Sequence, residues 1–176
     1  TLTSPSDLLD LIREYPEKIF VVDESYLPFV DNAHELSLIE ETGMPNLVVL
    51  SSMSKIFTIP GLRTGFLTAH EDIINRLKVH YQPWSVNALA QTVIRQVFEN
   101  PSFIDPFIEK SRAFVTAQRE WFIDRLDNLE GITPFESVTS FVLAELDPKI
   151  NSKQFCEQVG NEKILIRDCE NFMGLT

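Results

Sequence analysis

The sequence predicts an α/β fold in which short buried strands alternate with helices. Apolar segments rich in β-branched residues occupy 18–25 and 46–50, and a stretch of helical character at 37–42 lies between them. Amphipathic spacing of leucine and isoleucine marks further helices around these strands. The repeated order of strand, helix and strand indicates a sheet layered against helices.

The first part of the chain holds most of this alternation. Residues 4–15 predict a helix, because Ser4 can cap it, Pro5 suits its first position and Asp7 lies in its first turn. A layered α/β region is therefore expected over residues 1–100. The further elements expected there are strands at 18–25, 46–52 and 63–69 and helices at 37–42, 71–80 and 86–100.

The pattern changes after Pro101, which is a natural joint. Residues 102–129 predict one long aromatic-rich helix that is interrupted near Pro106. We place a domain boundary near residues 98–102 and expect an α+β region over 101–176. The further elements expected are strands at 131–137, 140–146 and 163–168 and a helix at 152–160.

Composition limits the partners of this chain. A formal net charge of −11 disfavours nucleic acid and anionic membranes, which need clustered Lys and Arg, so a small-molecule partner is expected. The 176 residues contain no apolar window long enough to span a membrane and no pattern of a leader peptide. The spacing of Cys156 and Cys169 suggests neither a disulfide nor a zinc site. We therefore expect a soluble cytoplasmic protein. No metal is assigned, because ligand spacing is lacking between His34, His70 and His80.

Candidate site residues follow the first two strands, since ligands of open α/β sheets lie at the carboxyl ends of strands. Asp23 follows one strand and residues 51–55 follow the next, so they converge if the strands are parallel neighbours. Alone, such an Asp is usually a turn former and such a lysine is usually solvated. Together with hydroxyls and an arginine, Lys55 is suited to form an imine with a carbonyl cofactor that carries phosphate.

The segments "DESY" at 23–26 and "SSMSKIFTIPGLRTGF" at 51–66 together resemble the pyridoxal-phosphate site of the fold type I aminotransferases. The shared pattern is S-x-S-K followed by G-L-R-x-G. The resemblance implies that Lys55 binds pyridoxal 5'-phosphate covalently, that Asp23 pairs with its pyridine nitrogen and that Tyr26 donates to its ring oxygen. The phosphate ligands that it implies are Ser52, Ser54 and Arg63.

Two further segments narrow the resemblance. "YQPWSVNALAQ" at 81–91 and "ILIRDCENFMGL" at 164–175 are similar to the histidinol-phosphate aminotransferase branch, and look closest to the threonine-phosphate decarboxylases of cobalamin biosynthesis. The implied activity is decarboxylation of a phosphorylated amino acid, with transamination as the alternative. Arg167 would meet the substrate phosphate, although an arginine with its head in water at an edge strand is equally reasonable.

The resemblance covers nearly the whole chain but only the latter half of such an enzyme. It implies the C-terminal half of a three-layer α/β/α large domain plus part of an α+β small domain, and a homodimer in the intact protein. Such enzymes carry an earlier segment that holds the cofactor phosphate, and a later arginine that binds the substrate carboxylate. We therefore expect this chain alone to be inactive.

Two other functions fit parts of the sequence. Ser52 to Lys55 also spell S-x-x-K, a serine acyl-enzyme signature, and "SVN" at 85–87 resembles its second motif. That signature requires a helix that starts at the serine and a K-T-G strand late in the chain. However, "RTG" at 63–65 precedes "SVN" instead of following it, and the loop with Pro60 and Gly61 is a poor buried helix. In the third interpretation the chain is a noncatalytic binding module and Lys55 is merely solvated.

Overall fold

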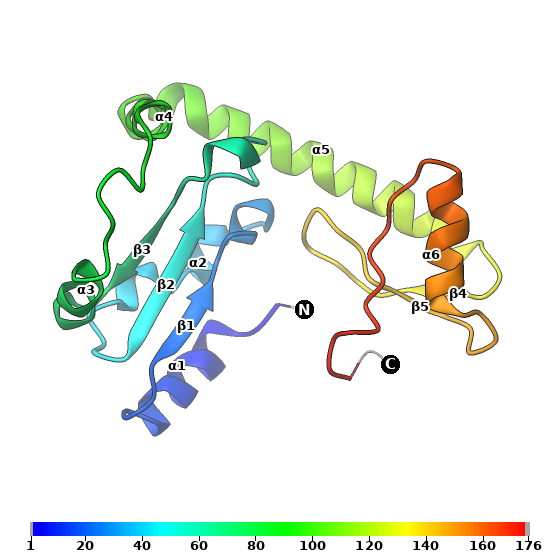
Figure 1. Cartoon of the computed structure of the whole chain (residues 1–176), viewed down its shortest axis with the longest axis horizontal. Coiled ribbons are helices and arrows are strands. Elements are labelled where there is room, and N and C mark those ends of the chain that lie inside the picture. Colours follow the sequence, from blue (N-terminus) through cyan, green and yellow to red (C-terminus); the bar gives the residue numbers. More distant parts are fainter. Residues whose placement is uncertain (1, 175–176) are drawn as a thin grey trace. The chain divides into compact units, whose positions relative to one another are not determined.

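The computed structural model describes residues 2–174, and the chain divides into two compact units. The first unit comprises Thr1–Gln118 and Val138–Ser140, and the second comprises Arg119–Ser137 and Phe141–Thr176. The division falls within α5 (Pro101–Asp127), a helix that belongs to both units (Figure 1). The expected domain boundary near residues 98–102 stays a prediction.

A three-stranded mixed sheet organises the first unit. Its order is β1 (Phe20–Asp23), β2 (Leu47–Ser52) and β3 (Gly65–Ala69), with β1 parallel and β3 antiparallel to β2. All three strands confirm the sequence prediction in shortened form, and the condition that the first two strands be parallel neighbours is met. Three short helical segments connect β1 to β2, namely η1 (Leu27–Phe29), α2 (Ala33–Leu36) and η2 (Ile39–Glu41).

The core of this unit lies between the sheet and α1 (Pro5–Glu14). Its central side chains are Ile12 of α1, Leu38, Leu47 and Val49, each exposed by 2% or less. The predicted helix is confirmed, but the Ser4 hydroxyl lies 2.6 Å from that of Ser6 and makes no cap bond to the backbone. Apolar burial on one face therefore fixes α1 more than its cap does.

Three helices follow the sheet, and all were predicted. They are α3 (Glu71–Lys78), α4 (Ala88–Glu99) and α5, and the Asn87 side chain caps α4 by accepting the Ala90 N–H at 2.9 Å. The predicted interruption near Pro106 is wrong, because α5 runs through that residue. Pro106 is the sixth residue of α5, so it removes only one hydrogen bond near a helix end where several N–H groups are free in any case.

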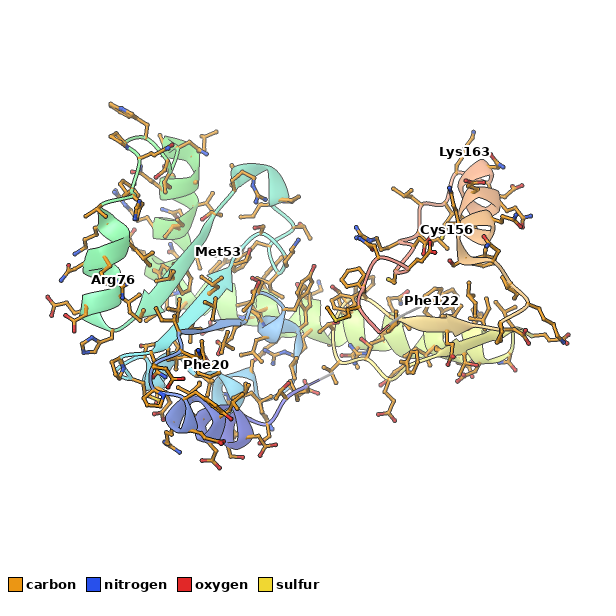
Figure 2. The ribbon with its side chains drawn as sticks, turned by 60° about the horizontal axis from the view of Figure 1, so that its bottom comes forward. Phe20, Met53, Arg76, Phe122, Cys156 and Lys163 are labelled. Carbon is orange, nitrogen blue, oxygen red and sulfur yellow. The ribbon has the colours of Figure 1, made fainter. Side chains whose placement is uncertain are left out.

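The second unit contains a short hairpin and a helix. β4 (Ile132–Pro134) pairs antiparallel with β5 (Ala144–Leu146), and α6 (Ser152–Asn161) follows, as predicted. Cys156 of α6 is labelled in Figure 2, and burial, Asp168 and Cys169 raise the pKa of its thiol. The strand predicted at 163–168 is wrong: no described strand pairs with this segment, and Leu165 is 96% exposed. Extended backbone without a ladder partner forms no strand.

Candidate active site

The carboxyl ends of β1 and β2 lie side by side, which places two of the predicted site segments at one edge of the sheet. The register pairs Asp23 with Leu50, and the Glu24 N–H donates to the Leu50 carbonyl at 2.8 Å. Asp23 is exposed, and its Oδ1 accepts the Ser25 N–H at 2.9 Å. Because paired residues share a face, Asp23 lies on the face opposite the Leu47 and Val49 core side chains.

Lys55 lies in a tight turn directly after β2. The Phe57 N–H donates to the Met53 carbonyl at 3.3 Å, and the Thr58 N–H donates to the Lys55 carbonyl at 3.2 Å. Met53, labelled in Figure 2, and Ile56 are buried on either side of the exposed lysine. Two buried apolar anchors therefore fix the backbone from which the Lys55 amine projects.

The structure brings the Lys55 amine to the Tyr26 ring. Lys55 Nζ lies 5.6 Å from the centroid of that ring, which is a cation–π contact between two loops. Tyr26 directly precedes η1, three residues after Asp23. Lys55 remains exposed, so residues 2–174 do not by themselves shield its amine from solvent.

The two serines predicted to bind phosphate contact each other. The hydroxyls of Ser52 and Ser54 are 2.8 Å apart, and the Ser54 hydroxyl also donates to the Thr64 carbonyl at 3.4 Å. Thr64 is buried, and its own hydroxyl has no hydrogen-bond partner among the described residues. This pair of hydroxyls connects the end of β2 to the start of β3.

Arg63 and Gly65 shape the return of the chain into β3. Arg63 adopts a left-handed backbone conformation with φ 52°, is exposed, and donates from Nη1 to the Pro60 carbonyl at 3.2 Å. A Cβ at position 65 would lie 2.7 Å from the Ser51 carbonyl oxygen, so this close approach of β2 and β3 requires glycine. The glycine after the arginine in the motif therefore has a packing reason.

This donor set fits a carbonyl cofactor that carries phosphate. It combines a primary amine, an exposed carboxylate at the neighbouring strand end, and hydroxyls with a guanidinium on the same chain segment. The S-x-x-K interpretation has no support here, because Ser52 is the last residue of β2 and does not begin a helix. The sequence motif and the strand-end geometry thus agree on the cofactor interpretation.

Arg167, the predicted substrate-phosphate residue, lies in the second unit. It is exposed, its guanidinium lies 5.3 Å from the Phe172 ring centroid, and its Nη2 donates to Asn171 Oδ1 at 3.4 Å. These contacts are local to residues 167–172. Its role toward substrate stays a prediction.

Sequence reasoning did not find two contacts made by α5. The Phe107 ring stacks on Phe57, with centroids 5.7 Å apart, and Arg112 Nε donates to the Pro28 carbonyl at 3.2 Å. The partners of each contact are many residues apart in the sequence, and neither pair belongs to a motif. Only the packing of α5 reveals them.

Comparison with known proteins gives one family. A sequence profile described as aminotransferase class I and II matches residues 1–173. Among curated relatives, the "adenosylcobalamin biosynthesis bifunctional protein CobDQ" of Leptospira interrogans is 32% identical over 97% of this chain and 19% of its own length. The histidinol-phosphate aminotransferase of Chlorobium luteolum is 30% identical over 96% of this chain and 44% of its own length.

A solved structure agrees with these relatives. The crystal structure of L-threonine-O-3-phosphate decarboxylase from Porphyromonas gingivalis superposes with a TM-score of 0.82 and 31% identity, covering 98% of this chain and 52% of that one. The chain therefore spans about half the length, or less, of these relatives.

Proposed function

The chain belongs to the class I and II aminotransferase family, whose members depend on pyridoxal phosphate, and we propose that it supplies the lysine-bearing part of such an active site. The substrate that we propose is a phosphorylated amino acid, decarboxylated as by a threonine-phosphate decarboxylase. The observation that carries the proposal is the approach of Lys55 Nζ to the Tyr26 ring, from a chain segment in which the hydroxyls of Ser52 and Ser54 contact each other.

Each candidate residue has a proposed task. Lys55 would hold the cofactor through its amine, and its Nζ, once released by the substrate amine, would move a proton at the substrate Cα. Asp23 would pair with the protonated pyridine nitrogen and keep it protonated, and Tyr26 would donate a hydrogen bond to the ring oxygen. When bound, the cofactor ring withdraws electrons from the substrate Cα. The phosphate ligands proposed are Ser52, Ser54 and Arg63.

The choice between decarboxylation and transamination rests on the relatives. The decarboxylase structure, at 31% identity, supports loss of the carboxylate as CO2, with a proton taking its place at Cα. The histidinol-phosphate aminotransferase, at 30% identity, supports transamination as the second candidate. Arg167 is proposed to bind the substrate phosphate, which both kinds of substrate carry.

The test is product identity. The whole protein is incubated with O-phosphothreonine alone, and separately with histidinol phosphate and 2-oxoglutarate. Release of CO2 from the first supports the decarboxylase, and formation of glutamate in the second supports the aminotransferase. Turnover that survives Lys55→Ala would contradict the assignment of the lysine, and labelling of Ser52 by a fluorescent penicillin would favour the acyl-enzyme interpretation.

We also propose a cytoplasmic homodimer, which equilibrium sedimentation of the whole protein and fractionation of its native cells would test. Within residues 2–174, no helix combines the length and the apolar character needed to cross a membrane.

A further inference from the structure

We propose that Phe107 and Arg112 of α5 are positioning residues that together hold the Lys55 turn and the Tyr26 loop at their mutual distance. This inference rests on the proposed function of Lys55 and Tyr26. It adds to that site two residues that lie outside every motif in the sequence.

The first contact holds the lysine turn. Phe107 stacks on Phe57 with an angle of 20° between the ring planes, and Phe57 lies two residues after Lys55 in the same turn. The Phe57 N–H donates to the Met53 carbonyl, so the ring and the turn backbone move together. A stacked ring at position 107 therefore restrains the backbone from which the Lys55 amine projects.

The second contact holds the tyrosine loop. Arg112 Nε donates to the carbonyl of Pro28, inside the 3-10 turn η1 that Tyr26 directly precedes, and the bond is partly buried. The carbonyls of Tyr26 and Leu27 accept N–H groups within that turn. The Pro28 carbonyl, which accepts the bond from Arg112, takes part in none of these turn bonds. Because the guanidinium donor is charged, this hydrogen bond is stronger than one between neutral groups.

A single continuous helix thus contacts both loops. The two contacting residues are five positions apart on α5, which is about 7.5 Å along a helix axis. The contacted residues each lie two positions beyond a site residue, Phe57 beyond Lys55 and Pro28 beyond Tyr26. A helix fixed to both loops restrains the distance of 5.6 Å between the Lys55 amine and the Tyr26 ring.

The test compares Phe107→Leu and Arg112→Met with matched variants of the same helix. Phe103→Leu removes a ring that is 72% exposed, and Lys110→Met removes an exposed cation. We measure amide hydrogen exchange of residues 26–30 and 53–58 in the apo form of the whole protein, and then its affinity for pyridoxal 5'-phosphate. Phe107→Tyr, which keeps the ring, serves as the rescue variant.

The expected result is specific to the two contacts. Each variant raises exchange in the segment that it contacts by about 3-fold to 10-fold, as expected for loss of one modest interaction, and weakens cofactor affinity by a similar factor. Phe107→Tyr restores both values. The matched variants change neither, and exchange in β3 stays as in the native protein.

Two outcomes overturn the proposal. The residues merely pack if Phe107→Leu and Arg112→Met lower the melting temperature while exchange at 26–30 and 53–58 and cofactor affinity stay native. The same conclusion follows if Phe103→Leu and Lys110→Met act equally. Borohydride trapping of the cofactor on native protein, lost in Lys55→Ala, separates the two proposals. Trapping without the exchange effect leaves the proposed function standing, and exchange without trapping removes the proposed function while the helix still holds both loops.

Discussion

Residues 51–66 and 164–174 both carry an arginine predicted to bind phosphate, yet the two segments differ in how the chain holds them. The first begins in β2, which pairs with strands on both sides, and Met53 and Ile56 are buried next to Lys55. The second forms no strand in the described chain. A motif is fixed in place when its flanking residues have partners for both their backbone and their apolar side chains.

The largest effect expected from this difference concerns turnover. Lys55→Ala should lower kcat of the whole protein by about a thousandfold or more, because the covalent attachment and the proton transfer are both lost. Arg167→Ala should mainly raise KM for the phosphorylated substrate. Steady-state kinetics of both variants check this, and equal losses of kcat would contradict the division of tasks.

The next effect concerns the free energy of unfolding, which should depend more on the core of the first unit than on residues 164–174. Ile12→Ala removes a fully buried core side chain and should cost about 2 to 5 kcal/mol in the free energy of unfolding. Leu165→Ala changes an exposed side chain and should stay within about 0.5 kcal/mol of the native protein. Urea denaturation of the two variants measures the contrast. A large loss for Leu165→Ala would show that residues 164–169 are packed after all.

Substitution of Arg63 and substitution of Arg167 should have different effects on the affinity for the cofactor. Arg63→Ala should weaken binding of pyridoxal 5'-phosphate by about 2 to 3 kcal/mol, if a charge-assisted bond to phosphate is lost. Arg167→Ala should leave cofactor affinity unchanged, since its proposed partner is the substrate. Titration of the apo protein, followed by absorbance, checks both values, and equal weakening would reassign Arg167 to the cofactor.

The smallest effect expected distinguishes two glycines. Gly65→Ala places a Cβ 2.7 Å from the Ser51 carbonyl and should destabilise the protein by about 1 to 3 kcal/mol. Gly160→Ala, in α6, meets nothing within 4 Å and should stabilise the helix by about 0.5 to 1 kcal/mol. Thermal unfolding of the two variants gives the signs. A harmless Gly65→Ala would mean that β2 and β3 can separate without cost.

The sequence predicted local structure well wherever short-range signals are strong. Pro5 and amphipathic spacing placed α1, and apolar runs placed β1, β2 and β3. The failures at Pro106 and at 163–168 both concern backbone hydrogen bonds, whose presence or loss the residue types alone do not decide. A helix end tolerates one lost bond, and a strand exists only with a neighbour.

By itself the sequence indicated the family and its cofactor, which the family match confirms, and it supplied the candidate residues that stay predictions. It could do so because an amine, a carboxylate and hydrogen-bond donors for phosphate are recognisable as residue types. Only the tertiary structure decided which of these groups meet. It brought Lys55 to Tyr26, joined the Ser54 hydroxyl to the Thr64 carbonyl, and added the contacts of Phe107 and Arg112. Contacts between distant residues depend on how whole elements pack, and no local pattern in the chain encodes that packing.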